Sequence, residues 1–276
     1  MSIIERGTPN PTTPELYVET PLAVQMIGEP YRGLGLIMRT LEPNTIKAWL
    51  LQSLPPIANR NFIEHACRFA EEIHRGQKRK DKKTPFIVHP YTSALLAVLA
   101  IKDITDAQVA ILVAHDTIED DKNLNEQDVK RTFNELGHPK ELVDPFAFGV
   151  NAFSRRTDNG KLKPSQYRRQ LEKTLRPHPE LKIPALKGFD TLHNYLTDIR
   201  DAIDNAEDRE LTKKLHHYRP KVDDTRILLN RSAPNSYGAV MLDQAVSLAE
   251  SLNPPERKHP SRMYTIFNGF TAHALR

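Results

Sequence analysis

The helical spacing of apolar residues from Asn59 onward is the feature that most constrains the fold of this chain. Apolar residues recur at the period of one helix face, and no alternating strand pattern of useful length occurs. The run from Val109 to Ala114 is almost wholly apolar, which indicates a helix buried on all sides. The sequence therefore predicts an all-α fold, a helical bundle built around this central run.

Start and stop signals divide the bundle into separate helices. We expect Asp106 to cap the central helix, and Asn125 and Gly137 to bound the next one. A helix over 140–153 should be interrupted near Pro145, and a basic loop should follow it from Arg155 to Lys163. The remaining helices are expected at 59–75, from about Pro90 through Leu99, and at 164–175, 184–202, 205–217 and 237–252.

The two ends of the chain differ from its middle. Eight prolines break residues 1–56 into short pieces, and only 45–54, around Trp49, suggests a short helix. We interpret 1–56 as an arm that packs on the main domain or on a partner subunit. Residues 57–202 should form the core, and 203–276 a helical extension packed on that core.

Composition restricts the function classes. The net charge of +4, from 39 basic and 35 acidic residues, suits a pocket for an anionic small molecule, and no basic stripe indicates nucleic-acid binding. The single cysteine, Cys67, excludes an internal disulfide and a cysteine-based metal cluster. The sequence has no apolar run long enough to span a membrane and no signal peptide, so we expect a cytoplasmic protein.

The stretch His115-Asp116-Thr117-Ile118-Glu119-Asp120 places four metal- or proton-binding side chains within six residues. On a helix, His115 would share a face with Glu119, and Asp116 with Asp120. The first doublet is suited to hold a divalent metal, and the second to orient an attacking water one turn further on. This pattern favours hydrolysis of a phosphate or pyrophosphate ester.

Two further segments carry compatible residues. His89 precedes Pro90 at a loop-to-helix junction, directly after the basic loop 77–84. Asp190 shares a helix face with Lys187 and Asn194, within an otherwise apolar stripe where a carboxylate is costly unless something polar faces it. Two imidazoles and two carboxylates suit Mn²⁺, with Fe²⁺ or Zn²⁺ as substitutes, and we assign them to His89, His115, Asp116 and Asp190.

These segments resemble, in order, the hydrolase domain of the RelA/SpoT homologues, an HD-domain family that makes and destroys the alarmones ppGpp and pppGpp. The resemblance covers roughly residues 59–200 and departs from the family at Thr191, where a basic residue is usual. It rests on the runs His74–Lys80, Thr84–Pro90, His115–Asp120 and Asp190–Asn194.

The resemblance implies an all-helical HD fold, a Mn²⁺ ion and removal of pyrophosphate from the 3′ position of the ribose. It implies that the four ligands named above hold the metal and that Glu119 and Asp120 assist the water. It places Arg79 and Lys80 along the base and phosphates and Asn194 near the ribose. Lys187, on the same helix face as Asp190 and Asn194, is a further predicted substrate contact.

Other residues near these motifs leave alternatives open. His74 and His193 are interpreted as packing or supporting residues. Tyr167 is compatible with stacking on guanine or with packing on the helix over 184–202. The basic residues of the loop after Phe153 are compatible with gathering the 5′-phosphates or with plain solvent exposure; these are Arg155, Arg156, Lys161 and Lys163.

Only 76 residues follow residue 200, so the chain resembles the hydrolase-only members of the family, the small alarmone hydrolases. The expected partner is a guanosine alarmone, with a homo-oligomer and a functional pairing with an alarmone synthetase also compatible. One alternative is an HD phosphohydrolase for an adenosine alarmone, NADPH or a nucleoside monophosphate. Another is a non-catalytic alarmone-binding regulator, and a third is a neutralising partner of a toxic synthetase.

Overall fold

Helices make up nearly all of the structure, a computed structural model that describes residues 42–157, 160–204, 209–232, 242–243 and 245–246. The all-α prediction is confirmed for these residues, apart from one pair of two-residue strands. The elements run in the order α3 (Pro43–Gln52), α4 (Arg60–Ile73), α5 (Val88–Ala100), α6 (Asp106–Ala114), α7 (Thr117–Asp120), α8 (Glu126–Glu135), α9 (Lys140–Phe153), β1 (Arg156–Thr157), β2 (Gly160–Lys161), α10 (Pro164–Thr174), the 3₁₀ turn η2 (Pro179–Leu181), α11 (Ile183–Asp204) and α12 (Arg209–Ser232).

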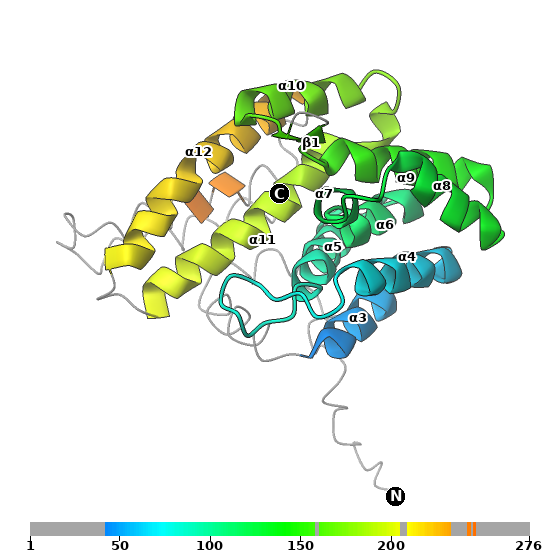
Figure 1. Cartoon of the computed structure of the whole chain (residues 1–276), viewed down its shortest axis with the longest axis horizontal. Coiled ribbons are helices and arrows are strands. Elements are labelled where there is room, and N and C mark those ends of the chain that lie inside the picture. Colours follow the sequence, from blue (N-terminus) through cyan, green and yellow to red (C-terminus); the bar gives the residue numbers. More distant parts are fainter. Residues whose placement is uncertain (1–41, 158–159, 205–208, 233–241, 244, 247–276) are drawn as a thin grey trace, which may run out of the picture.

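Helix α6 is the centre of the bundle, as its apolar sequence predicts. It packs against α4, α5 and α9, with α11 also touching it (Figure 1). Val109, Ile111, Leu112 and Val113 are each at most 1% exposed, and every such side chain contributes about 1.5–3 kcal/mol on burial. The last residue of α6 is Ala114, so the motif that follows leaves directly from the core.

Local capping signals fix the ends of several helices as the sequence predicts. The Asn59 side chain accepts a hydrogen bond from the Phe62 amide at the start of α4, and Gly76 follows the helix with a φ of +76°. Asn125 caps α8 by accepting from the amides of Gln127 and Asp128. Gly137, at φ +78°, lies just beyond the end of that helix.

The expected cap of α6 is wrong by one residue. Thr105, not Asp106, is the N-cap, because its hydroxyl accepts from the Gln108 amide while the Gln108 side chain accepts from the Thr105 amide. The Asp106 carboxylate instead accepts a hydrogen bond from the Asn59 amide at 3.1 Å. Asp106 therefore joins the start of α4 to the start of α6.

The helix over 140–153 is continuous, so the expected interruption at Pro145 is wrong. Proline removes one backbone hydrogen bond, but Phe146 and Val150, which follow it on α9, are fully buried in the core, and α9 packs on α6. Gly149 of the same helix lies so close to Ile111 of α6 that an added Cβ would be 2.2 Å from its Cδ1. Tight packing of α9 on α6 therefore outweighs the local cost of the proline.

The segment expected as a basic loop contains a short antiparallel hairpin. Arg156 pairs with Lys161 and Thr157 with Gly160, and the Thr157 hydroxyl donates to the Gly160 carbonyl at 2.7 Å. Gly160 adopts a φ of +107°, which favours glycine. Residues 158–159 between the strands lie outside the described part.

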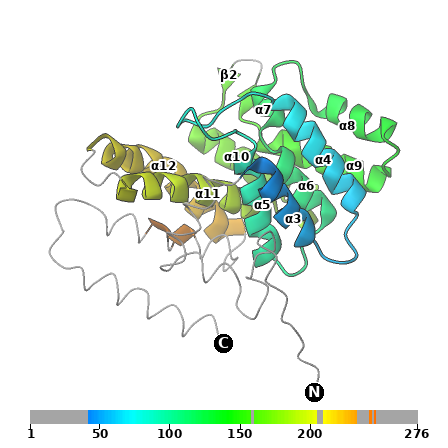
Figure 2. The same cartoon turned by 90° about the horizontal axis from the view of Figure 1, so that it is seen from below.

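Helix α3 is part of the core rather than separate from it. Ile46 and Leu50 are fully buried, and the helix packs on α5 and α4 (Figure 2). The short helix expected at 45–54 is thus confirmed, and residues 1–41 of the proposed arm lie outside the described residues.

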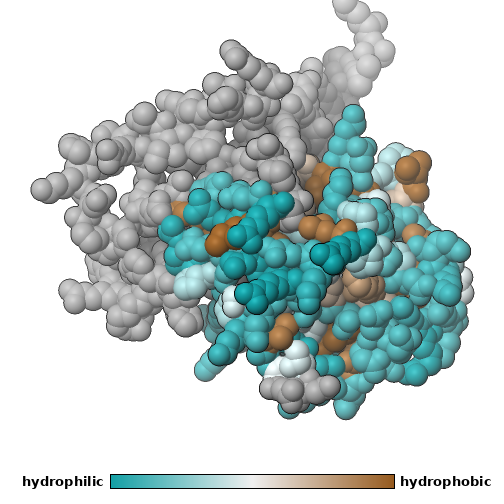
Figure 3. Space-filling view, turned by 90° about the horizontal axis from the view of Figure 1, so that it is seen from above, coloured by the Kyte–Doolittle hydropathy of each residue, from teal (hydrophilic) through white to brown (hydrophobic). Residues whose placement is uncertain are grey.

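Helices α11 and α12 lie side by side along much of their lengths (Figure 1). The helix expected at 205–217 is confirmed only from Arg209 and extends much further, to Ser232, while most of the helix expected at 237–252 lies outside the described residues. The described surface in Figure 3 is largely hydrophilic with scattered apolar residues. In the described part of the chain, no helix combines the length and apolarity needed to cross a bilayer.

Candidate metal centre and adjoining cavity

The His-Asp doublet lies in the junction between two helices, not inside one continuous helix as its spacing suggested. His115 is the C-cap of α6, and Asp116 is the N-cap of the single turn α7. The Thr117 hydroxyl donates to the Ala114 carbonyl at 2.7 Å, and the His115 Nδ1 lies 2.7 Å from the Leu112 carbonyl oxygen. These bonds to the last turn of α6 fix the doublet at the end of the core helix.

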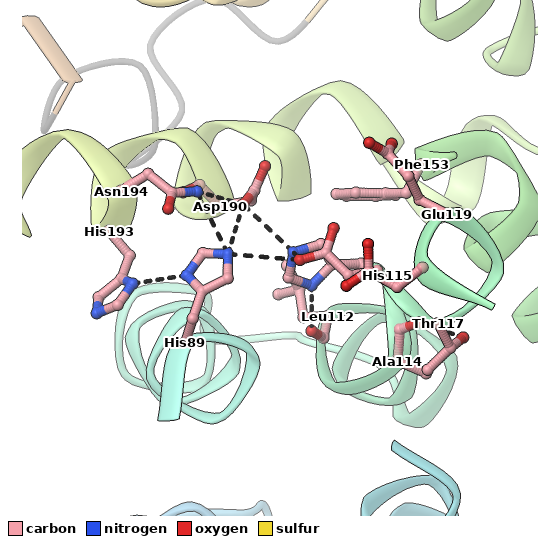
Figure 4. A network of polar contacts seen from close by, with 12 residues as sticks. His89, Leu112, Ala114, His115, Thr117, Glu119, Phe153, Asp190, His193 and Asn194 are labelled. Atoms are coloured by element: carbon pink, nitrogen blue, oxygen red, sulfur yellow. Dashed lines mark hydrogen bonds and ion pairs between the residues drawn. The ribbon is translucent and has the colours of Figure 1, made fainter. Parts of the chain in front are cut away.

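Side chains from three elements converge at this junction (Figure 4). The His89 Nε2, from α5, lies 2.9 Å from Oδ1 of Asp190, which α11 supplies. The His115 Nε2 lies 3.1 Å from Asp116 Oδ2 and 3.3 Å from Asp190 Oδ1. One ligand atom each from His89, His115 and Asp116 falls within 4.8 Å of the others, a grouping able to hold a metal ion.

The protonation of His115 tests whether a cation fits this group. Its Nδ1 faces the Leu112 carbonyl and must carry the hydrogen, which leaves a lone pair on Nε2 of the neutral ring. That Nε2 is buried and makes no hydrogen bond within the described residues, yet it faces the Asp116 and Asp190 carboxylates. A lone pair facing two carboxylates is stabilised by a proton on Nε2 or by a metal ion between the three groups, so the residues present fit a metal ion.

The pKa values agree with a strong demand for positive charge. Burial alone would lower the pKa of His115, but the Asp116 and Asp190 carboxylates outweigh it and raise the pKa to about 10. Burial opposes ionisation of Asp116, and the His115 imidazolium nevertheless holds the pKa of that carboxyl well below its usual range. In the metal-free protein, a proton on His115 therefore takes the role of the cation.

Asp190 has the most polar contacts of the group although only 6% of its side chain is exposed. Its Oδ2 forms an ion pair with the Lys187 ammonium, one turn earlier on α11, and its Oδ1 accepts from the Asn194 amide at 3.0 Å. Burial opposes ionisation, but Lys187 and then His115 keep the pKa of Asp190 well below the usual value. Asp190 is therefore an anion in the folded protein.

His89 is held by a second histidine. Its ring stacks on His193 with centroids 4.9 Å apart, and the two Nδ1 atoms lie 2.7 Å from one another. Burial and the nearby Arg79 lower the pKa of His89 to about 4, so the ring is neutral at pH 7. A neutral imidazole whose Nδ1 is engaged leaves Nε2 for the shared site, which is what a metal-binding histidine requires.

Glu119 and Asp120 diverge, although both line the same cavity. Glu119 accepts from the Arg155 amide at 2.9 Å and from the Lys161 ammonium at 2.8 Å, which ties it to the hairpin. Asp120 accepts from the Gln77 amide at 2.8 Å on the opposite side, near the basic loop. The catalytic role predicted for the pair stays a prediction.

A cavity of about 320 Å³ opens beside the convergent side chains. Its wall includes six basic and five acidic residues, a mixture suited to a charged ligand that carries phosphates together with a divalent cation. The basic residues are Arg79, Lys80, Arg155, Arg168, Lys187 and Lys221; the acidic ones are Asp116, Glu119, Asp120, Asp190 and Asp224.

The four predicted substrate contacts all line this cavity: Arg79, Lys80, Lys187 and Asn194. Arg79 and Lys80 come from the basic loop before α5. The Arg79 guanidinium donates to the Asn194 side-chain oxygen at 2.7 Å and lies 5.7 Å from the Phe86 ring centroid. Because the Asn194 amide also donates to Asp190, the basic loop is joined to α11 through a single side chain. Direct contact of these residues with a substrate stays a prediction.

The basic residues of the hairpin have different surroundings. Arg156 donates to two backbone carbonyls of the α7–α8 loop, Lys161 bonds to Glu119, and Lys163 is exposed. Arg155, which precedes β1, is the one basic residue of this segment that lines the cavity. Tyr167 packs in the core, 7% exposed, with its hydroxyl donating to a backbone carbonyl of α9.

Residues of α10 and α12 complete the cavity, and sequence reasoning missed them. Arg168 of α10 donates to Asp224 of α12 at 2.7 Å, and Lys221 and Thr225 come from the same face of α12. No motif marks these positions, because only the packing of α12 on α10 and α11 brings them to the site.

Neither a scan against protein-family models nor a search of curated proteins gives a match to this chain. The geometry therefore carries the functional argument together with the motifs. A buried group able to hold a divalent cation, beside a cavity rich in cationic side chains, suits the binding and hydrolysis of a phosphate ester.

Proposed function

We propose that this chain is a metal-dependent hydrolase that removes the 3′-diphosphate of ppGpp and pppGpp, releasing pyrophosphate and GDP or GTP. The observation that carries the proposal is the grouping of His89, His115 and Asp116, of which His89 and Asp116 line a cavity that also contains six basic side chains. The order of the motifs, which resembles the hydrolase domain of the RelA/SpoT homologues, supplies the guanosine alarmone as the substrate.

His89, His115, Asp116 and Asp190 would hold the ion, for which Mn²⁺ is the first choice and Fe²⁺ or Zn²⁺ the substitutes. A bound divalent cation supplies Lewis-acid polarisation of a phosphoryl oxygen and lowers the pKa of water. His193 and Lys187 support this set, since the first stacks on His89 and the second pairs with Asp190.

Glu119 and Asp120 are the carboxylates of the cavity that we assign to orienting the attacking water and accepting its proton. The Arg155 amide and the Lys161 ammonium hold both oxygens of Glu119 at the hairpin, which fixes the direction in which this carboxylate points. Arg79, Lys80, Lys187 and Asn194 are assigned to the substrate, because cationic and amide donors at the wall stabilise phosphate oxygens as charge develops.

The test is release of pyrophosphate from ppGpp by the purified chain with Mn²⁺, with the nucleotide product identified by ion-exchange chromatography. Glu119→Gln should retain the metal and lose activity by at least about a hundredfold, the usual contribution of a general base. Glu135→Gln, an exposed glutamate at the end of α8, is the matched control and should be fully active.

A nucleotide panel separates this proposal from its alternatives. Turnover of an adenosine alarmone, NADPH or a nucleoside monophosphate in place of ppGpp would overturn the substrate assignment while keeping the hydrolase class. Tight ppGpp binding without turnover under Mn²⁺, Fe²⁺ or Zn²⁺ would instead indicate a non-catalytic regulator.

A further inference from the structure

The wall of the cavity formed by α10, α12 and the segment between α9 and β1 carries three basic side chains, of which the sequence singled out only Arg155 as a possible phosphate contact. Arg155 lies between α9 and β1, Arg168 on α10 and Lys221 on α12, and all three line the same cavity. They come from segments well separated in the sequence, so folding gathers their charges at one wall.

Two of these side chains carry buried donors without acceptors. The Nε–H groups of Arg155 and Arg168 are buried and have no hydrogen-bond partner among the described residues. Other nitrogens of each guanidinium are engaged, by the Leu162 carbonyl at 2.7 Å and by Asp224 at 2.7 Å, so both side chains are held in place. Because the two Nε atoms are closed to solvent, an anionic ligand in the cavity would be bound by the remaining N–H groups of each guanidinium.

The balance of charge at this wall is positive. Among the described residues no carboxylate pairs with Arg155, whose guanidinium donates only to a neutral carbonyl. Lys221 lies at the exposed rim, where partial burial and then the cations Lys80, Arg155 and Lys187 lower the pKa of its ammonium. Basic groups therefore outweigh acidic ones around Lys221, which is the environment expected of a phosphate-binding site.

Arg155 is also oriented in advance of binding. Its guanidinium lies 5.8 Å from the centroid of the Tyr167 ring, and the Tyr167 hydroxyl is anchored to the Phe153 carbonyl at 2.6 Å. A cation held against an aromatic face loses little conformational freedom when a ligand arrives. This arrangement distinguishes Arg155 from Arg156 and Lys161 of the hairpin, neither of which lines the cavity.

We propose that Arg155, Arg168 and Lys221 form a subsite for the 5′-diphosphate of a nucleotide, separate from the metal-binding group. In the context of the proposed function, this subsite would hold the phosphates that are not cleaved, while the 3′-diphosphate lies at the metal. The identity of those phosphates rests on the proposed function, but the subsite itself requires only a nucleoside 5′-diphosphate and no metal.

The experiment is an equilibrium titration of GDP into the full chain in EDTA at low ionic strength. Arg155→Gln and Lys221→Gln should each raise the dissociation constant about tenfold, as expected for loss of one charge-assisted contact to phosphate. The affinity for guanosine, which lacks phosphates, should be the same in both variants. Arg169→Gln and Lys173→Gln are matched controls, because both residues are exposed on α10 and neither lines the cavity.

Lys221 lies at the rim, so its variant is expected to fold normally, and thermal melts of all variants check this. With ppGpp and Mn²⁺, both variants should raise KM and leave kcat close to wild type. The subsite is wrong if wild type does not bind GDP in EDTA, or if Arg155→Gln and Lys221→Gln bind it as tightly as the controls. If GDP binding depends on these residues but ppGpp is not hydrolysed, the subsite stands and the proposed function is wrong. If the variants hydrolyse ppGpp with an unchanged KM, the proposed function stands and the subsite is wrong.

Discussion

Replacing Asp190 by Asn tests the electrostatics of the site without any assumption about its substrate. Asp190 is buried, with 6% of its side chain exposed, and its ion-pair partner Lys187 is 18% exposed. Asparagine preserves the shape of the side chain and removes its charge. The Lys187 ammonium is then left largely buried without its counterion, since Asp190 is the carboxylate with which it forms an ion pair among the described residues.

The expected cost is large because breaking one partner of a buried ion pair typically lowers the free energy of unfolding by about 3–5 kcal/mol. For a chain of this size that corresponds to a fall of roughly 10 °C in the melting temperature. The loss should be measured by urea unfolding at pH 7 in EDTA, so that metal binding does not contribute to the difference.

The double variant Lys187→Met/Asp190→Asn separates the buried charge from other effects of the substitution. The Lys187 ammonium lies 5.4 Å from the ring centroids of both Phe153 and Tyr167, so a methionine there gains aromatic contacts. We expect the double variant to lie within about 1 kcal/mol of wild type, because both members of the ion pair become uncharged and neither charge is left buried without its partner. Lys187→Met alone should lose less than Asp190→Asn, because the His115 imidazolium remains beside the carboxylate.

Addition of Mn²⁺ then separates the ligand role of Asp190 from its structural role. Binding at a hundred times the dissociation constant stabilises a protein by about 2.7 kcal/mol. This stabilisation should persist in Lys187→Met and be lost in both variants that lack the Asp190 carboxylate. An Asp190→Asn variant as stable as wild type in EDTA, or a double variant no more stable than Asp190→Asn, would refute the reasoning.

Three further predictions concern other parts of the site and core. Asp116→Ala should abolish both Mn²⁺ retention, measured by metal analysis after gel filtration, and pyrophosphate release; native activity would contradict the mechanism. In EDTA, the free energy of unfolding should be greatest near pH 6.5. It should fall as the pH rises from there toward about 10, because folded His115 keeps a proton that the unfolded chain releases. It should also fall as the pH drops toward about 4, because the unfolded chain binds a proton that folded His89 does not. A flat profile over pH 4–10 would count against both shifts. Gly149→Ala should lower the free energy of unfolding by about 1–3 kcal/mol, measured in urea, because its Cβ would overlap the Ile111 side chain of α6. The space around Gly137 is open by comparison, since an added Cβ there would meet no atom within 4 Å.

The sequence was most informative where local chemistry decides the structure. The apolar run of α6 fixes a buried centre, and Asn125 with Gly137 fixes the ends of α8, because caps and glycine turns act within a few residues. The four predicted ligands also lie together, because two of them are adjacent in the chain, and His89 in the first turn of α5 packs against Asp190 within α11.

The remaining features depend on packing between segments far apart in the chain. Arg168 meets Asp224 across 56 positions, and nothing in the neighbourhood of either residue marks it as part of a cavity wall. The continuity of α9 through Pro145 likewise reflects its contact with α6, which local propensity does not report. Long-range packing therefore determined which basic residues face the site and which face solvent.

The bond between Arg79 and Asn194 makes two binding equilibria dependent on each other. Asn194 donates to Asp190 with one end of its amide and accepts from Arg79 with the other. A nucleotide that draws the guanidinium away also changes the hydrogen bonding of a carboxylate assigned to the ion. Thermodynamic reciprocity then requires that the metal alter nucleotide affinity by the same factor by which the nucleotide alters metal affinity. Under the proposed function, the supply of divalent ions would thereby set the alarmone concentration at which the protein responds.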